Sequence, residues 1–541
     1  MICDISPGDI CVLPFPFNDL SGKKKRPALA LSKPDEYGDV RFAFITARNS
    51  NSLLTVKLGY DDYAEGYIPL PRDGYIRLDK QYSLHKDIVI KKKTRLNPST
   101  LETVLRQNVI KEIAPFCDEK YQASQFKAGQ SVVPVSGKLI GKQEIELIVE
   151  SALDGWLTSG RFNTVFEKKT AEFIGVKHVL TTNSGSSANL LAFTALTSPK
   201  LGNKAIKEGD EVITVAASFP TTVNPILQFG AVPVFVDINI LSCNINEELI
   251  EAAISPKTKA IMLAHTLGNP FNLAEVKRIC EKYGLWLIED CCDALGSTYN
   301  GKHVGTFGDI ATLSFYPAHH ITMGEGGAVF TNNSKLNRII ESFRDWGRDC
   351  FCGPGKDNTC GKRFEKQMGE LPFGYDHKYT YSHLGYNLKI TDMQAAIGVA
   401  QMDKLQDFIA VRRENFTYLK QQLLDYSDKL ILPVATEHSM PSWFGFPITI
   451  RADSNVSRLD LLRALEKNRI ATRLLFAGNI TCQPYMEGGK YRVSGNLKNT
   501  DLVMNNTFWV GVYPALDFEM LNHIAGVIIS VLRKQDNKNN L

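Results

Sequence analysis

The sequence has 541 residues, of which 44% are hydrophobic and 22% are charged, and its formal net charge is +4. This length exceeds what one hydrophobic core supports, so we expect two or three domains. The small net charge gives no reason by itself to expect a nucleic-acid-binding protein. No apolar run approaches the roughly 20 residues that span a bilayer, and the N-terminus lacks the basic-then-apolar pattern of a signal peptide.

The eleven cysteines are an odd number spread thinly over a long chain. This usage argues against a disulfide scaffold. We therefore expect a cytoplasmic protein in which a metal or cluster site accounts for some of the cysteines.

Residues 1–116 are predicted to form a small β-rich unit. Three strand-like runs, at 10–15, 28–32 and 40–46, are separated by Pro, Gly and Asp turn signals. Short motifs here resemble the PemK/MazF family of toxins: Gly8-Asp9-Ile10, Pro14-Phe15-Pro16-Phe17 and Arg26-Pro27-Ala28-Leu29-Ala30.

The toxin resemblance implies an SH3-like all-β barrel that cuts RNA without a metal. The positions that match the family's catalytic residues are Arg26, Thr46, Arg77 and Asp79. Cutting RNA through its own 2′-hydroxyl needs a base, an acid and cationic stabilisation of the phosphorane, which such residues can supply. RNA or an antitoxin is then the implied partner. The alternative is an inactive remnant in which Arg77 and Asp79 form an exposed ion pair.

Residues 117–133 are polar and aperiodic, and we predict a linker there. Beyond them the chain alternates strand-like and helical segments, which is typical of an α/β domain. Helical spacing is clear over 144–157 and 161–174. We predict a large cofactor-binding α/β domain at 134–419 and a small C-terminal α/β subdomain at 420–535.

Five residues in the large domain suit a ligand with a phosphate and an aromatic ring. Gly185 and Ser186 begin a helix after a strand, where free N–H groups favour a phosphate monoester, and Ser314 can add a hydroxyl. Phe219 follows another strand and can stack on a pyridine ring, although core packing is an equal alternative. Asp290 ends an apolar strand, where helix capping is a common role.

The stretch from 314 to 327 is the strongest candidate for chemistry. The apolar run 310–315 predicts a buried strand, and His319, His320 and a flexible Gly-Glu-Gly-Gly turn follow it. The pattern resembles the active-site strand of aspartate-aminotransferase-like (fold type I) enzymes that act on nucleotide-linked sugars. Those enzymes usually have a lysine at the position of His319, and it forms a Schiff base with pyridoxal phosphate. Imidazole cannot form that bond.

This resemblance implies that the cofactor is held non-covalently, most simply as pyridoxamine 5′-phosphate. It implies that Asp290 faces the pyridinium nitrogen, and that Asn387 of one subunit reaches the cofactor phosphate of its neighbour in a homodimer. His319 is the candidate base, since a neutral imidazole near pH 7 suits proton transfer, and His320 is the alternative.

Four cysteines form a second constellation. Cys292 and Cys350 are separated by 57 residues, Cys350 and Cys352 by one, and Cys352 and Cys360 by seven. Four thiolates can hold a 2Fe–2S cluster, while zinc and unligated thiols are the alternatives. With the Asp-Cys-Cys-Asp and His-His motifs, this spacing resembles the CDP-6-deoxy-L-threo-D-glycero-4-hexulose 3-dehydrase family over about 133–533.

The second resemblance implies a dehydrase that removes the C3 hydroxyl of CDP-4-keto-6-deoxyglucose. The cluster would relay electrons from a flavin/iron–sulfur reductase, and the products would be the 3,6-dideoxyhexoses of lipopolysaccharide O-antigens. Two other functions stay open. A nucleotide-sugar aminotransferase should need lysine at position 319 and no cluster, and an RNA-cutting or RNA-binding protein would place its function in residues 1–116.

Overall fold

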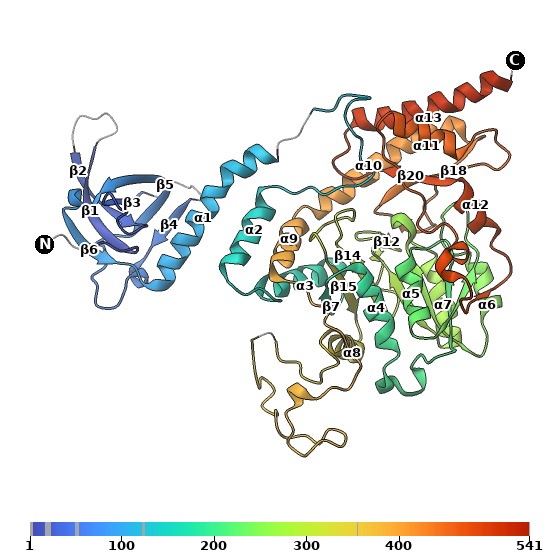
Figure 1. Ribbon diagram of the computed structural model, residues 1–541, viewed down its shortest axis with the longest axis horizontal. Helices are drawn as coiled ribbons and strands as arrows, with labels where there is room; N and C mark the ends of the chain where they lie inside the picture. The colour runs from blue at the N-terminus through green and yellow to red at the C-terminus, as the bar shows by residue number, and fades with distance from the viewer. Residues whose placement is uncertain (1–3, 17–22, 49–53, 122–124, 354, 540–541) are drawn as a thin grey trace. The chain divides into compact units, whose positions relative to one another are not determined.

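The computed structural model describes residues 4–16, 23–48, 54–121, 125–353 and 355–539. The chain divides into two compact units, Met1–Gln122 and Ala123–Leu541 (Figure 1). Among the described residues, no helix combines the length and the apolar character that a membrane crossing requires.

The first unit is an antiparallel six-stranded sheet followed by a long helix. The strand order is β4-β5-β3-β2-β1-β6. Helix α1 starts where the Asn97 side chain accepts a hydrogen bond of 2.7 Å from the Thr100 N–H. The elements are β1 Asp9–Pro16, β2 Lys23–Ala30, β3 Asp39–Thr46, β4 Thr55–Leu58, β5 Gly74–His85, β6 Lys91–Arg95 and α1 Pro98–Lys120.

Both faces of this sheet carry buried apolar side chains. Ile10 and Leu29 pair across β1 and β2 and belong to one cluster, while the next pair, Cys11 and Ala28, belongs to another. Because successive strand residues point to opposite faces, the sheet is covered on both sides. The β-rich character predicted for this segment is thus observed, whereas its SH3-like closure stays a prediction.

The predicted linker is shorter and better anchored than its polar sequence indicated. Helix α1 continues to Lys120, past the expected linker start at residue 117, although Pro115 lies inside it, and Cys117 of its last turn is buried. At the other end, Phe126 and Val133 belong to a core of the second unit. The Val133 N–H donates to the Arg469 carbonyl at 2.9 Å.

The second unit contains an eight-stranded sheet in the order β19-β9-β8-β10-β11-β14-β15-β7. All pairs are parallel except those that β15 makes with β14 and β7. The strands are β7 His178–Thr182, β8 Glu211–Val215, β9 Val232–Val236, β10 Thr258–Ala264, β11 Trp286–Asp290, β14 Ile310–Ser314, β15 Gly327–Thr331 and β19 Arg492–Val493.

Helices cover both faces of this sheet, as expected for a mostly parallel sheet buried on both sides. Ile261 and Leu263 of β10 belong to the core on one face, and Ala260 and Met262 to the core on the other. The helices of the whole second unit are α2 Lys142–Leu153, α3 Arg161–Ile174, α4 Gly185–Leu196, α5 Pro220–Gln228, α6 Ile250–Ala253, α7 Leu273–Tyr283, α8 Ser334–Arg344, α9 Asp392–Met402, α10 Leu405–Leu423, α11 Arg458–Lys467, α12 Lys498–Asn506 and α13 Phe518–Asn539.

The predicted ends of two helices can be compared with the observed ends, and they agree for α3 but not for α2. Helix α3 has the predicted bounds, 161–174, and Gly175 ends it with a φ of 82°. Helix α2 ends at Leu153 rather than at residue 157, and Gly155 follows with a φ of 64°, a conformation that favours glycine.

The C-terminal part forms a second, smaller layer around the antiparallel sheet β16-β18-β20. Its core includes Phe446, Phe508 and, from helix α10, Phe416. Helix α10 runs through the subdomain boundary predicted at residue 420, so it belongs to both parts. The remaining strands are β16 Leu430–Ile431, β18 Gly445–Ile450, β20 Thr507–Gly511, β12 Thr298–Tyr299, β13 Lys302–His303 and β17 Ser439–Met440.

Candidate active site

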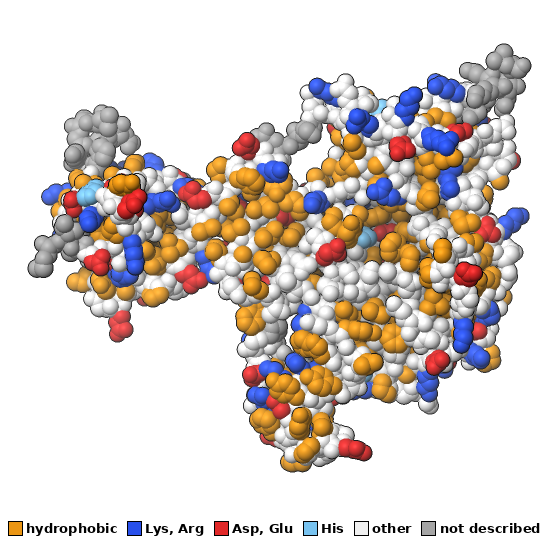
Figure 2. All heavy atoms as spheres, in the orientation of Figure 1, with side chains coloured by type: hydrophobic (Ala, Val, Ile, Leu, Met, Phe, Trp, Pro, Cys, Tyr) orange, Lys and Arg blue, Asp and Glu red, His pale blue; other side chains and the backbone are white. Residues whose placement is uncertain are grey.

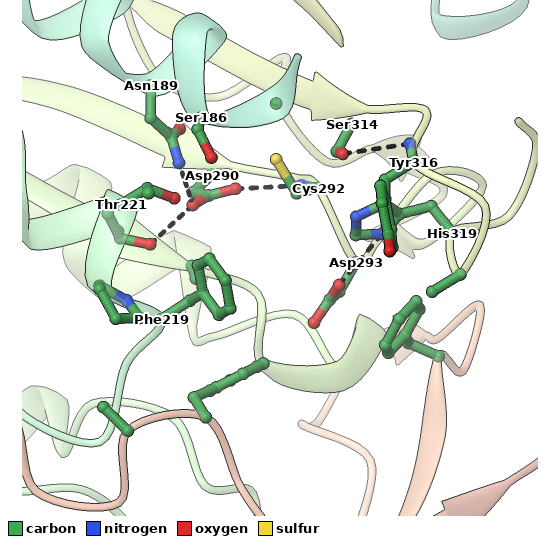
Figure 3. A pocket seen from close by; sticks show the side chains of 18 of the residues that line it. Ser186, Asn189, Phe219, Thr221, Asp290, Cys292, Asp293, Ser314, Tyr316 and His319 are labelled. Carbon is green, nitrogen blue, oxygen red and sulfur yellow. Dashed lines mark hydrogen bonds and ion pairs between the residues drawn. The ribbon is translucent and has the colours of Figure 1, made fainter. Parts of the chain in front are cut away.

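A cavity of about 920 Å³ lies at the carboxyl ends of the central strands of the second unit (Figure 3). Asp290 ends β11 and Ser314 ends β14, and both line the cavity. Phe444, Arg473 and Trp509 contribute to the wall from the C-terminal layer. In open α/β sheets ligands bind outside the carboxyl ends of the strands, so this cavity is the expected binding site.

Asp290 is the buried acid of the cavity, with only 5% of its surface exposed. Its Oδ2 accepts hydrogen bonds from Asn189 Nδ2 at 2.7 Å and from Thr222 Oγ1 at 2.8 Å, and its Oδ1 accepts one from the Cys292 N–H at 3.1 Å. All three donors are neutral. The carboxylate is therefore fixed in direction but not neutralised, which leaves it suited to a protonated ring nitrogen in the cavity.

The start of helix α4 lines the cavity with Gly185 and Ser186. Ser184 caps the helix by accepting a hydrogen bond of 3.0 Å from the Ser187 N–H. A Cβ on residue 185 would lie 2.4 Å from the Ser314 Cβ, so only glycine allows this close approach. The helix start and the Ser314 hydroxyl meet as predicted, at a place that suits a phosphate.

His319 lines the cavity and faces a second acid, Asp293 (Figure 3). The His319 Nδ1 and Asp293 Oδ1 lie 3.3 Å apart, without the alignment of a good hydrogen bond. Burial raises the pKa of Asp293, an effect that His319 partly offsets. Since Nδ1 faces the carboxylate, Nε2 is the ring nitrogen that can exchange a proton with a bound molecule.

His320 has a different environment, which separates the two candidate bases. It is 3% exposed, it does not line the cavity, and its Nε2 lies 2.9 Å from the Ser442 carbonyl. Burial lowers its pKa well below the usual value for histidine. His320 therefore supports the loop, and His319 is the histidine available for chemistry.

A buried arginine of helix α10 holds the same loop from behind. Arg412 is 1% exposed, and its Nη2 donates to the His319 carbonyl at 3.3 Å. Its Nη1 donates to the carbonyls of Trp443 and Phe444 at 3.2 and 3.3 Å. Burial lowers the pKa of Arg412 to about 10, and Asp293 opposes that shift. The arginine thus joins the histidine loop to the C-terminal layer.

Glu289 precedes Asp290 and points to the other side of the sheet. It accepts hydrogen bonds from the backbone N–H groups of Gly305 at 2.7 Å and Phe307 at 3.0 Å. Its Oε2 also lies 3.1 Å from His265 Nε2. With Cys291 these two side chains place three ligand atoms within 4.8 Å of one another. Because Glu289 and His265 already have hydrogen-bond partners, we interpret the group as structural.

Of the two remaining residues predicted to bind the cofactor, Phe219 lines the cavity and Asn387 does not. Phe219 lines the cavity, is 50% exposed and makes an edge-on ring contact with Phe476 at 6.2 Å. Asn387 does not line it: its Oδ1 accepts a hydrogen bond of 2.6 Å from Lys389 Nζ. Within a single chain, Asn387 is therefore not placed on the cofactor.

The four predicted cluster ligands do not come together in the chain. Cys350, Cys352 and Cys360 lie in the segment 345–391 between α8 and α9, which we call the cysteine loop. Cys352 Sγ lies 3.1 Å from the hydroxyl of Thr359, the neighbour of Cys360. Cys292 instead lines the cavity, where burial and the Asp290 carboxylate raise the pKa of its thiol. As arranged, the four residues do not fit one cluster.

In the first unit, the strand register places the four predicted toxin-site residues on one face of the sheet. Ala28 pairs with Phe44, and Phe44 pairs with Arg77. The Arg26 guanidinium lies 4.9 Å above the Phe44 ring. Residues two positions along a strand share a face, so Arg26, Thr46, Arg77 and Asp79 share this one. Arg77 Nε also donates to Asp79 Oδ1 at 2.7 Å, and this bond lowers the pKa of Asp79.

Three residues of the cavity were not predicted from the sequence. Asn189 and Thr222 orient Asp290, and Asp293 faces His319. Asp293 has a recognisable signal, since an acid three residues after a strand-end acid can turn into the same cavity. Asn189 and Thr222 lie on separate helices, and no local pattern marks them.

The cavity fits a pyridoxal-type cofactor in its pyridoxamine form. It offers a helix start and a hydroxyl for a phosphate, a fixed carboxylate for a ring nitrogen and an aromatic side chain beside the ring. Asn224, which also lines the cavity, has a buried Oδ1 without a hydrogen-bond partner among the described residues. No lysine is found among the described residues that line the cavity, so a covalent bond of the usual type has no amine there.

Comparisons with known proteins agree with this site. Residues 138–529 match the DegT/DnrJ/EryC1/StrS aminotransferase family. The lipopolysaccharide biosynthesis protein RfbH of Salmonella typhimurium is 65% identical over 420 residues, covering 78% of this chain and 96% of that protein. The dTDP-4-dehydro-2,6-dideoxy-D-glucose 3-dehydratase of Saccharopolyspora spinosa is 51% identical over 413 residues, covering 76% of this chain and 89% of that protein.

A solved structure shows the same fold. The GDP-4-keto-6-deoxy-D-mannose-3-dehydratase of E. coli, crystallised with hydrated pyridoxal phosphate, superimposes with a TM-score of 0.66 at 30% identity. The superposition covers 73% of this chain and 99% of the E. coli enzyme. The second unit therefore has the fold of the pyridoxal-phosphate-dependent aminotransferase-like enzymes, as its α/β pattern and site motifs predicted.

The raised pKa of Asp293 predicts a pH-dependent stability. Its carboxyl contributes most to stability below the unfolded pKa of about 3.8, and this contribution is lost as the pH rises through the higher folded value. Asp293→Asn should therefore gain stability relative to the wild type between about pH 4 and pH 7. Urea unfolding followed by tryptophan fluorescence measures this, because all five tryptophans lie in the second unit.

Asp376 is the control with the opposite sign, since its hydrogen bond with Arg363 lowers its pKa. Asp376→Asn should lose stability relative to the wild type only as the pH rises through the range below about 4, and the difference should stay nearly constant from pH 4 to pH 7, because the lowered pKa lies below the ordinary value of about 3.8. A constant difference between Asp293→Asn and the wild type from pH 4 to pH 7 would contradict the raised pKa of Asp293.

Proposed function

Because the chain belongs to the DegT/DnrJ/EryC1/StrS aminotransferase family, we propose that it is a pyridoxamine-phosphate-dependent nucleotide-sugar 3-dehydrase. Its substrate would be CDP-4-keto-6-deoxyglucose, and its product a precursor of the 3,6-dideoxyhexoses of lipopolysaccharide O-antigens. The observation that carries the proposal is a cavity with His319 beside Asp293 and no lysine among its described lining residues. The names of two relatives, both 3-dehydratases, support the reaction type.

The CDP group is the more specific part of the proposal. The two relatives are named for dTDP-linked and GDP-linked sugars, so the nucleotide is not common to the family. CDP is supported by the cysteine spacing together with the Asp-Cys-Cys-Asp and His-His motifs. A nucleotide-sugar aminotransferase would share the fold, but it would need an amine at the position of His319.

Each residue of the cavity has a separate role in the proposed reaction. When bound, pyridoxamine phosphate supplies an amine for the sugar ketone and a ring that accepts electrons. Gly185, Ser186 and Ser314 bind the phosphate, and Asp290 holds the proton on the ring nitrogen. With the cofactor bound, His319 Nε2 would act as the base that accepts a proton from the cofactor and as the acid that returns it to the departing C3 hydroxyl. Asp293 keeps the other proton of the imidazole on Nδ1 and fixes the direction of the ring.

Replacing the C3 hydroxyl by hydrogen releases water and consumes two electrons and two protons. These electrons must come from outside the sugar, which is why we propose a 2Fe–2S cluster and a flavin/iron–sulfur reductase as partner. The spacing of Cys292, Cys350, Cys352 and Cys360 supports the cluster. No step is assigned to it, because these four thiols are not gathered in the chain as described above.

His319→Asn tests the base. The variant should retain pyridoxamine phosphate, because Asp290 and the Gly185–Ser186 helix start hold the cofactor independently of the histidine. Elimination should slow by roughly 10²–10⁴-fold, the usual contribution of a positioned base. Cofactor retention is measured by dialysis and absorbance, and elimination by loss of the sugar nucleotide in single turnover.

His438→Asn is the matched control, because the His438 side chain is 61% exposed on the surface. It should match the wild type in both assays. In a second variant, His319→Lys, borohydride should fix pyridoxal phosphate to the chain, whereas the wild type should not be labelled. Elimination at the wild-type rate by His319→Asn would show that His319 is not the base.

Cys352→Ser tests the cluster. The wild type, purified without oxygen, should contain iron and show visible absorbance, and the variant should lose both. Pyridoxamine phosphate binding and elimination should survive, since Cys352 lies in the cysteine loop outside the cavity. Only reductase-coupled turnover should fail. Stoichiometric zinc without iron in the wild type would exclude the cluster.

A second candidate function concerns the first unit, which we propose cuts or binds RNA. The observation that favours it is the common face of Arg26, Thr46, Arg77 and Asp79, where two cations and an acid stand together. The ion pair between Arg77 and Asp79 also fits the inactive alternative, so activity must decide between them.

Expression of residues 1–122 alone tests this second function. The fragment has its own apolar clusters, so we expect it to fold, to cut RNA and to slow growth. Arg26→Ala should relieve the growth defect. Arg41→Ala is the matched control, because Arg41 is exposed and alternates to the other face of β3. A folded fragment that leaves all RNA intact would reduce the unit to a remnant.

A further inference from the structure

A second, much smaller cavity borders the loop that carries His319 and His320. The centre of a water molecule has about 10 Å³ of space there, and one buried water needs about 10–15 Å³ of such space. The walls of this small cavity include His320 from the loop, Gln401 from α9 and Arg412 from α10. Among the described residues, His319 alone lines both this cavity and the large one. The small cavity therefore adjoins the candidate base.

The polar side chains of the small cavity are deeply buried. Arg412 and Gln401 are each 1% exposed, and His320 is 3% exposed. They lie beneath the surface of the molecule rather than among the basic and acidic side chains that are interspersed on it (Figure 2). Buried polar atoms in folded proteins almost always have a hydrogen-bond partner. Among the described residues, Arg412 Nε and His320 Nδ1 have none, so these two atoms are not bonded to each other either.

The two unpaired atoms need partners of opposite kinds. His320 Nε2 lies 2.9 Å from the Ser442 carbonyl. Because a carbonyl can only accept, Nε2 carries the proton, and Nδ1 of the neutral ring is an acceptor. Burial and the charge of Arg412 lower the pKa of His320, which keeps the ring neutral. A guanidinium can only donate, so Arg412 Nε–H needs an acceptor. Water is the smallest molecule that serves both atoms.

Gln401 supplies a third partner for such a molecule. Its Nε2 donates to Glu144 Oε1 at 2.6 Å, which identifies that atom as the amide nitrogen. Its Oε1 accepts one hydrogen bond of 3.3 Å, from the Thr322 N–H, and has a second lone pair. Buried waters typically make about three hydrogen bonds. One donor, Arg412 Nε, and two acceptors, His320 Nδ1 and the Gln401 oxygen, match a water with two O–H groups.

We propose that the small cavity is a binding site for one buried water molecule. The water accepts a hydrogen bond from Arg412 Nε and donates to His320 Nδ1 and Gln401 Oε1. Arg412 also donates directly to the His319 carbonyl at 3.3 Å. The guanidinium thus holds one histidine directly and the next through the water, which makes Arg412 and His320 positioning residues for His319. This positioning role rests on the proposed function of His319 as base, whereas the water site does not.

Crystal structures of the full-length protein, at a resolution that shows ordered waters, test the site. The wild type should have one peak at about 2.7–3.2 Å from both Arg412 Nε and His320 Nδ1. In His320→Gln the amide nitrogen can replace Nε2 at the Ser442 carbonyl, but no atom replaces Nδ1, so the peak should be lost. In His320→Asn the amide oxygen can replace Nδ1, so the peak should remain. His438→Gln, at an exposed histidine, is the matched control and should keep the peak.

Single-turnover kinetics test the positioning role with the same variants. His320→Gln should slow elimination by less than the 10²–10⁴-fold expected when the base itself is removed. Its retention of pyridoxamine phosphate and its half-saturating substrate concentration should match the wild type, because the groups that bind these molecules do not change. His320→Asn should lose less of the rate than His320→Gln, and His438→Gln should lose none. A larger loss in His320→Asn would show that the bond to Ser442, and not the water, positions the loop.

The other outcomes separate the water site from the proposed function. A direct bond between Arg412 Nε and His320 Nδ1, or a wild-type cavity without the peak, overturns the site, even if a variant fails to fold. A peak that persists in His320→Gln removes His320 from the partners of the water. Loss of the peak at an unchanged elimination rate overturns the positioning role. A wild type that holds the water but eliminates nothing refutes the proposed function and the positioning role, while the water site stands.

Discussion

The buried carboxylate of Asp290 is the constraint on which the rest of the cavity depends. A carboxylate taken out of water is costly unless hydrogen bonds replace its hydration. Its donors come from α4 through Asn189, from α5 through Thr222 and from the turn after β11 through the Cys292 N–H. Asn189 in turn accepts a hydrogen bond of 2.7 Å from Thr312 of β14. One acid thereby fixes two helices and two strands around the ring site.

The loop that carries His319 and His320 depends on a second buried charge, that of Arg412. Arg412 has three carbonyls as hydrogen-bond acceptors, and one of them belongs to His319. Its positive charge lies close enough to Asp293 to act on that carboxyl. The C-terminal layer therefore contributes to the cavity in two ways, because it forms part of the cavity wall and because it helps to set the position of His319 and the electrostatic field around it.

Sequence patterns predicted those helices and strands whose positions depend on neighbouring residues in the chain. The helical spacing over 161–174 predicted the bounds of α3, and the apolar runs before Asp290 and Ser314 predicted β11 and β14. Since the ends of neighbouring strands meet at one edge of a sheet, Gly185, Ser314, Asp290 and His319 came together as expected. The patterns could not show Asn189 or Thr222, whose role depends on how two helices pack. They also could not show that Cys292 lines the cavity whereas Cys350 does not, because residue spacing carries no information about distance in space.

The strand that ends in Glu289 and Asp290 places two acids in sequence and on opposite sides of the sheet. Glu289 is held by backbone N–H groups and His265, and Asp290 faces the cavity. Alternation along a strand means that a shift by one residue exchanges the two faces. Loss or gain of a single residue within β11 would therefore bring the wrong acid to the cavity while leaving the composition of the strand almost unchanged. This part of the gene should tolerate substitutions at several apolar positions, yet almost no change of length.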